Sequence, residues 1–184
     1  MKANWPIGHK IQNRWEISKV LRGGMGVVYI VYDHDWHEVF AAKTFQERVF
    51  ENSSALDLFT QEAITWINLD RHENVVQARF LEFIEGKPFL FLEYINGGDL
   101  GSLIGTPCLM DDLPQVLRLA IQFCDGMSHI TSKGIKAHRD IKPQNCLVNE
   151  DRLLKVTDFG LAKVFDDLNS ELSISPSRSP NHHN

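Results

Sequence analysis

At 184 residues the chain has room for one ordinary domain or for two small lobes that share a cleft. Hydrophobic residues make up 43% and charged residues 23%, which argues against disorder, and the net charge of −5 argues against wholesale binding of nucleic acid. The three cysteines are widely spaced and form no CxxC pair, which is typical of a reduced intracellular compartment. Because no apolar run has signal-peptide or membrane-spanning length, we predict a soluble cytoplasmic protein.

The first part of the chain predicts short β-strands. Residues 14–21, 26–33 and 38–45 (RWEISKVL, GVVYIVYD and EVFAAKTF) carry β-branched or aromatic side chains near a period of two. The glycine-rich stretch GGMG at 23–26 separates the first two runs. We therefore expect neighbouring strands with a loop of glycines between them.

One helix and two more strands follow. Residues 54–69 repeat apolar side chains near every 3.6 positions, and Ser53 or Ser54 can cap the start of this helix. The runs 77–85 and 89–95 have strand character and are separated by a predicted tight turn. Up to residue 95, the sequence thus predicts five strands and one helix.

After residue 96 the pattern becomes helical. Residues 112–134 carry an apolar stripe suited to a long core helix, and Gly134 stands where a C-terminal cap belongs. Two short strand candidates, 146–149 and 153–157, come next. From Asp166 onward the sequence is rich in Ser, Pro, Asn and Asp, which predicts a flexible tail.

Five segments carry residue types suited to phosphate and metal chemistry. They are LRGGMGVVY at 21–29, FAAK at 40–43, FLFLEYINGGDL at 89–100, HRDIKPQN at 138–145 and KVTDFGLAK at 155–163. Taken singly, the first three fit a hairpin loop, a surface lysine that ends a strand, and an edge strand followed by a turn. The fourth is hard to explain as a surface loop, because eight residues stand in a specific order. Together, the five segments resemble the protein kinase family.

The resemblance implies an ATP site beside the glycine-rich loop, whose backbone N–H groups would close on the phosphates. Leu21 stands where the family has its first glycine. Leu92 would limit the back of the pocket, and the backbone of residues 93–95 would bind adenine. The residues implied to contact ATP are Leu21, Gly23, Gly24, Gly26, Val28, Ala41, Lys43, Leu92, Glu93, Tyr94, Ile95 and Leu147.

The resemblance also implies a coupling between the helix at 54–69 and the nucleotide site. Lys43 would meet the α- and β-phosphates, and Glu62 on the helix would hold this lysine by an ion pair. Phe159 would pack under the same helix, near Trp66 and His138. A shift of the helix would then move both the lysine and the metal site.

Four further residues are implied to act on the transferred phosphate. Asp140 would accept the proton of the incoming hydroxyl, and Lys142 would steady the phosphate in the pattern of serine/threonine kinases. Asn145 and Asp158 would hold Mg²⁺ through an amide and a carboxylate oxygen. ATP and Mg²⁺ are thus the implied cofactors.

We therefore predict an α+β, protein-kinase-like two-lobe fold. Residues 1–95 would form a complete small lobe, with a five-stranded antiparallel sheet, one helix and the start of the hinge. Residues 96–166 would form only the first part of the mainly helical large lobe, with the catalytic loop and the DFG motif. Residues 167–184 would be the flexible start of the activation segment. The GGMGVVY and HENVV segments are most similar to bacterial-type serine/threonine kinases.

The leading hypothesis is an ATP- and Mg²⁺-dependent serine/threonine protein kinase that acts on a protein substrate. No Ala-Pro-Glu follows Asp158, so we expect a fragment or a natural truncation with little activity alone. A partner or a missing C-terminal region would cover the apolar helix at 113–133. The alternative is a nucleotide-binding pseudokinase or interaction module without catalysis: Leu21 favours it, whereas the intact phosphate, metal and base residues oppose it. Neither hypothesis includes a nucleic acid or a membrane segment.

Overall fold

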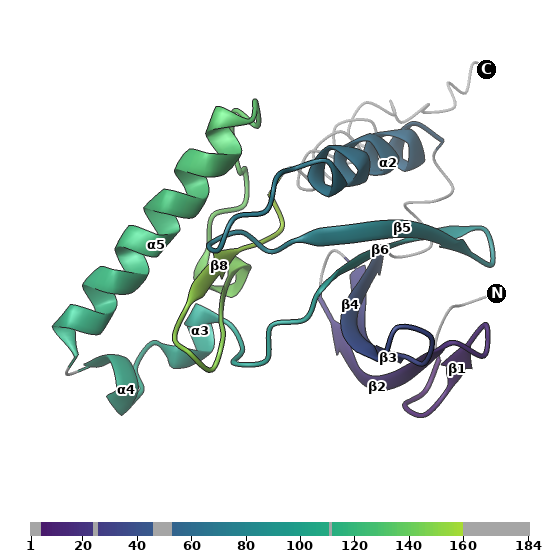
Figure 1. The fold of residues 1–184 in the computed structure, drawn as a ribbon, viewed down its shortest axis with the longest axis horizontal. Coiled ribbons are helices and arrows are strands. Elements are labelled where there is room, and N and C mark those ends of the chain that lie inside the picture. The colour runs from purple at the N-terminus through teal and green to yellow at the C-terminus, as the bar shows by residue number, and fades with distance from the viewer. Residues whose placement is uncertain (1–4, 24–25, 46–52, 111, 160–184) are drawn as a thin grey trace, which may run out of the picture.

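The largest element is one antiparallel sheet with the strand order β1-β2-β3-β4-β6-β5 (Figure 1). The computed structural model describes residues 5–23, 26–45, 53–110 and 112–159. The strands are β1 Lys10–Ile11, β2 Trp15–Arg22, β3 Gly26–Asp33, β4 Glu38–Phe45, β5 Ala78–Ile84 and β6 Lys87–Glu93. The predicted antiparallel sheet is confirmed with one strand more than expected, because two-residue β1 is too short to show a period-two pattern.

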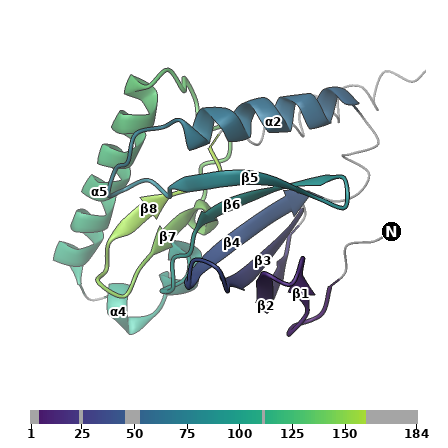
Figure 2. The ribbon, with the colours of Figure 1, turned by 45° about the vertical axis from the view of Figure 1, so that its right-hand side comes forward.

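Helix α2, Ser53–Ile67, covers one face of this sheet and lies along β5 (Figure 2). Phe59, Ala63 and Trp66 are buried along its inner side, three or four residues apart, as one face of a helix requires. The indole Nε1 of Trp66 donates a hydrogen bond to the carbonyl oxygen of Val76 at 2.8 Å. The helix is thereby fixed both by apolar packing and by one buried hydrogen bond.

A second apolar cluster lies on the face of the sheet opposite to α2. Trp15, Tyr29, Phe40 and Phe91 are fully or almost fully buried in it. The rings of Trp15 and Phe91 lie 4.9 Å apart between centroids, within the range of favourable aromatic pairs. This aromatic pair therefore joins β2 to β6, two strands that are separated in the sheet by β3 and β4.

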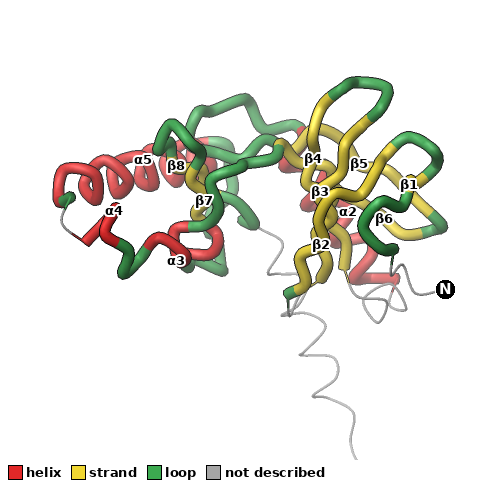
Figure 3. The backbone as a smooth tube through the Cα atoms, turned by 90° about the horizontal axis from the view of Figure 1, so that it is seen from below, coloured by secondary structure: helices red, strands yellow, loops and turns green. Residues whose placement is uncertain are grey.

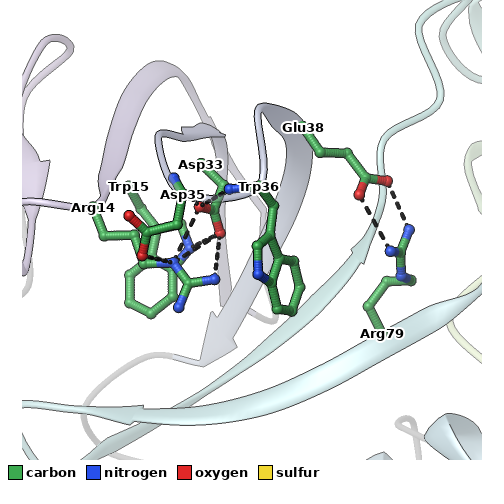
Figure 4. A network of polar contacts seen from close by, with 7 residues as sticks. All are labelled: Arg14, Trp15, Asp33, Asp35, Trp36, Glu38 and Arg79. Atoms are coloured by element: carbon green, nitrogen blue, oxygen red, sulfur yellow. Dashed lines mark hydrogen bonds and ion pairs between the residues drawn. The ribbon is translucent and has the colours of Figure 1, made fainter.

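A polar network centred on Asp33 joins the start of β2 to the end of β3 (Figure 4). The Asp33 carboxylate is fully buried and accepts hydrogen bonds from Arg14 Nε at 3.0 Å and Trp15 Nε1 at 2.8 Å. Its other oxygen accepts the backbone N–H groups of Asp35 at 2.9 Å and Trp36 at 3.1 Å. Burial raises the pKa of Asp33, but these hydrogen bonds outweigh it and hold the pKa below its ordinary value.

The second part of the chain is mainly helical, as Figure 3 shows. It contains α3 Leu100–Leu103, α4 Pro107–Met110, α5 Leu113–Ser132, the 3₁₀ turn η1 Pro143–Asn145, and the paired strands β7 Cys146–Val148 and β8 Leu154–Val156. Asp112 caps α5 by accepting the N–H of Gln115 at 2.9 Å, and Gly134, with φ of +92°, follows its end as predicted.

Only part of the apolar stripe on α5 is buried. Leu119 and Ile130 lie in the core, whereas Leu113, Leu117 and Ile121 are more than half exposed. The buried residues face β8, which lies beside α5 in both Figure 1 and Figure 2. Within the described residues, the opposite side of the helix therefore carries exposed apolar side chains.

The loop after α2 fastens the helical part to the sheet. Asn74 donates from its side chain to Leu154 O at 2.9 Å and accepts the N–H of Val156 through its own carbonyl at 2.9 Å. A β-carbon at Gly126 of α5 would overlap the carbonyl oxygen of Asn74, so only glycine allows this close approach. Strand β8 is consequently held between α5 and the loop.

Some sequence predictions lie outside the described residues, among them Gly24 and the tail at 167–184. The division at residue 95 into a small and a large lobe remains a prediction. Among the helices that the structure describes, none is long and apolar enough to cross a membrane.

Candidate active site

A cavity of about 360 Å³ opens between the sheet and the helical part. Nine of the predicted ATP contacts line it: Leu21, Val28, Ala41, Lys43, Leu92, Glu93, Tyr94, Ile95 and Leu147. Asp158 lines it as well. Gly23 and Gly26 are not among the lining residues, so any contact they make with phosphate stays a prediction.

Eight lining residues had not been predicted, namely Lys19, Ile30, Val76, Asn96, Gly98, Asp99, Gln144 and Thr157. Strand alternation could have identified two of them, because Lys19 and Ile30 stand two positions from Leu21 and Val28 on the same strand faces. Val76 and Thr157 come from segments far apart in the sequence. Thr157 adjoins Asp158 in the 155–163 segment that the resemblance already assigns to the site, whereas no local pattern connects Val76 to the cleft.

Leu21 forms part of the cavity wall. It lies opposite Val28 in the β2–β3 register, and both side chains reach the cavity. A register shift between Ile17 and Lys19 sets which residues of β2 face the cleft. The residue that departs from the family pattern therefore contributes an apolar side chain to the site.

Gly26 has a structural reason to be glycine. A β-carbon there would overlap the carbonyl oxygen of Thr44 on the neighbouring strand β4, whereas one at Gly23 would meet nothing within 4 Å. The close approach of β3 to β4 thus requires a glycine at the start of β3.

Lys43 pairs with Asp158. Its Nζ lies 2.7 Å from Asp158 Oδ1, and the two side chains are 9% and 27% exposed. Asp158 has a φ of +66°, a left-handed conformation that is uncommon for a residue other than glycine and is often found at functional sites. The predicted ion pair between Lys43 and Glu62 is not formed, although both residues lie in the described ranges. The role of Glu62 stays a prediction.

Asp140, Lys142 and Asn145 lie together in the structure, and their catalytic roles stay a prediction. Lys142 Nζ is 2.7 Å from Asp140 Oδ2, and the side-chain amide of Asn145 donates to the same oxygen at 2.9 Å and to the Asp140 carbonyl at 2.8 Å. Burial raises the pKa of Asp140, but the hydrogen bonds and the charge of Lys142 outweigh it and bring the pKa below its ordinary value. Asp140 is therefore ionised at neutral pH.

Asn145 and Asp158 fit a magnesium site in donor chemistry. The side-chain amide nitrogen of Asn145 donates both of its hydrogen bonds to Asp140, and the side-chain oxygen Oδ1 is then the atom that could bind a cation. The backbone N–H of Thr157, the residue before Asp158, donates to the backbone carbonyl of Asn145 at 3.0 Å. This hydrogen bond holds the two candidate ligands near each other. Mg²⁺ prefers oxygen ligands and is usually bound by one or two protein groups with water and phosphate completing the shell.

Phe159 lies where the resemblance places it. Its ring centroid is 4.5 Å from that of Trp66 on α2 and 6.2 Å from that of His138. His138 is buried, and burial lowers the pKa of its imidazole, which keeps the ring neutral. The rings of Trp66, Phe159 and His138 thus link α2 to the segment that contains Asp158 and to the loop that begins at His138.

The comparisons with known proteins agree with this arrangement. Residues 15–178 match the family model described as protein kinase domain. The chain is 33% identical over 181 residues to the serine/threonine-protein kinase BCK1/SLK1/SSP31 of Saccharomyces cerevisiae, covering 94% of this chain and 12% of that protein. It is 30% identical over 154 residues to the serine/threonine-protein kinase Pkn1 of Myxococcus xanthus, covering 82% of this chain and 22% of that protein.

Two solved structures are similar in fold. The apo form of PpkA-294 matches with a TM-score of 0.76 at 24% identity, over 93% of this chain and 67% of that one. A point mutant of the kinase domain of Mycobacterium tuberculosis PknI matches with a TM-score of 0.69 at 19% identity, over 85% and 63%. Because the relatives include both eukaryotic and bacterial kinases, the bacterial-type subdivision stays a prediction. The chain belongs to the protein kinase family.

Proposed function

We propose that the chain is the nucleotide-binding and catalytic-loop region of an ATP- and Mg²⁺-dependent serine/threonine protein kinase. The observation that carries this proposal is the contact of Asp140 with Lys142 and Asn145, next to a cleft in which Lys43 meets Asp158. An ionised carboxylate beside a cation can accept a proton from a hydroxyl group. The serine/threonine kinases among its relatives support the same interpretation.

In this proposal the apolar walls of the cleft, among them Val28, Ala41 and Leu147, hold the adenine, and the backbone of residues 93–95 offers it polar partners. Lys43, freed from Asp158, binds phosphate oxygens. Bound Mg²⁺ would neutralise phosphate charge, held by Asn145 and Asp158.

The transfer step then depends on the catalytic loop. Asp140 orients the substrate hydroxyl and takes its proton, and Lys142 places a positive charge where the phosphate passes. These two groups are already 2.7 Å apart, so little rearrangement of the loop is required.

A transfer assay tests this function. Labelled Mg²⁺-ATP and a serine-rich protein substrate are incubated with the chain, with Asp140→Asn, and with Asp151→Asn, which removes an exposed carboxylate between β7 and β8. We expect slow transfer that requires Mg²⁺, is lost in Asp140→Asn and persists in Asp151→Asn. Equal transfer by Asp140→Asn would contradict the assigned base.

The second candidate is a nucleotide-binding module that works without transfer. Two observations favour it: Lys43 is paired with Asp158 rather than Glu62, and α5 exposes Leu117 and Ile121. Tight Mg²⁺-ATP binding with no transfer, in this chain and in a longer version of it, would support this candidate over the first.

A further inference from the structure

We propose that Lys155 is a positioning residue: through its contact with Glu93, it holds the adenine-binding edge of the cleft in place. The inference rests on the proposed function, because it takes the backbone of residues 93–95 as the edge that meets adenine. Glu93 lines the nucleotide cavity and also a second cavity of about 280 Å³, which Lys155 and Gln77 line as well. Glu93 therefore lies between the nucleotide cavity and this second cavity.

Three contacts fix Glu93 in place. Its Oε1 accepts a hydrogen bond from Lys155 Nζ at 2.9 Å and another from the backbone N–H of Gln77 at 2.8 Å. Its own N–H donates to the Gln77 carbonyl at 2.9 Å. Both the side chain and the backbone of Glu93 are thus constrained, including the peptide group between Leu92 and Glu93.

The ion pair is sheltered from water. The side chains of Lys155 and Glu93 are 14% and 25% exposed, in contrast to most surface pairs, which are screened and contribute little. A charge-assisted hydrogen bond in such a place is stronger than a neutral one. The contact can therefore hold a preferred geometry between two segments that are 62 residues apart.

Lys155 also lies close in the fold to two other parts of the site. It lies in the middle of β8, directly opposite Leu147 of β7, which forms part of the cavity wall. Asp158, the candidate metal ligand, follows three residues later. The Glu93–Lys155 pair consequently fixes the distance between the adenine edge, the apolar wall and the metal-binding carboxylate.

Adenosine binding to the full 184-residue chain measures this role, because adenosine contacts the hinge and lacks phosphate. Lys155→Met removes the charge while keeping most of the side-chain length, and we expect it to weaken adenosine binding about five- to tenfold. Lys155→Arg should restore the affinity to within about twofold, since it keeps a cation at this place. Glu93→Gln keeps an oxygen that can accept the N–H of Gln77 but removes the charge, and it should also weaken adenosine binding. In the double variant with Lys155→Met, the loss of binding free energy should be smaller than the sum of the two single losses.

The matched control is an ion pair within the six-stranded sheet, between β4 and β5. Arg79 and Glu38 form two contacts at 2.6 and 3.2 Å (Figure 4). Neither residue lines the cleft. Arg79→Met should lower the thermal midpoint of unfolding yet leave adenosine affinity unchanged. A purely structural role for Lys155 would give the same result as this control.

The outcomes separate the inference from the proposed function. Unchanged adenosine affinity in Lys155→Met, with a wild-type chain that binds adenosine and Mg²⁺-ATP, would overturn the inference alone. A wild-type chain that binds neither would overturn the proposed function and the inference with it. If Lys155→Met does not fold, Glu93→Gln decides, and an affinity equal to wild type would again overturn the inference.

Discussion

Asp33→Asn is expected to destabilise the fold by about 3 kcal/mol, although Asp33 lies outside the cleft. The substitution keeps the shape of the side chain but removes the charge that Arg14 meets at 2.8 Å, and it points an amide toward N–H donors. Breaking a buried ion pair by removing one partner typically costs about 3–5 kcal/mol, and we take the lower end because the Arg14 side chain is 27% exposed.

Thermal unfolding followed by circular dichroism checks this magnitude. For a domain of this size, about 3 kcal/mol corresponds to a midpoint lowered by roughly 6–12 °C. Asp35→Asn is the matched control, because Asp35 also pairs with Arg14, at 3.2 Å, but its side chain is 65% exposed; it should cost less than about 1 kcal/mol. Equal midpoints for the two variants would refute the argument from burial.

Three further predictions concern the glycine-rich loop, the cleft wall and the response to pH. Gly26→Ala should lower the unfolding midpoint by several degrees through its clash with Thr44 O, while Gly23→Ala should change it little. Leu21→Gly should weaken Mg²⁺-ATP binding a fewfold in a titration, since it removes apolar wall; tighter binding would contradict the placement of Leu21. Burial lowers the pKa of His138 in the folded chain below the unfolded value of 6.5, so the folded chain is stabilised by a neutral His138 above pH 6.5 and loses this stability as the pH falls. The unfolding midpoint of His138→Phe should therefore fall less on acidification than that of the wild type.

The strands and the long helix could be predicted because their signals are local. Alternating side chains along β3 and β4 identify them, and Gly134 marks the end of α5 before any contact is known. The loop around Asp140 was also predictable, since Lys142 and Asn145 are close in sequence and need only one turn of η1 to meet.

The remaining features depend on contacts between distant segments. The Glu93–Lys155 pair and the Asn74–Leu154 hydrogen bond join residues that no local pattern relates. The partner of Lys43 could not be settled from spacing, because both Glu62 and Asp158 offer a carboxylate and the backbone conformation of Asp158 brings it to the lysine. The orientation of Leu21 depends on the register shift in β2, which leaves no clear mark in the sequence.

The central claim is that Lys43, Asn145 and Asp158 form a nucleotide site in these 184 residues, and thermal unfolding with and without Mg²⁺-ATP tests it most directly. At about one hundred times its dissociation constant, a ligand stabilises a formed site by about 2.7 kcal/mol, or roughly 5–11 °C. We predict a magnesium-dependent rise in the midpoint that disappears in Asp158→Ala and persists in Asp151→Ala. A cooperative transition with no rise, or an equal rise in Asp158→Ala, would contradict the claim.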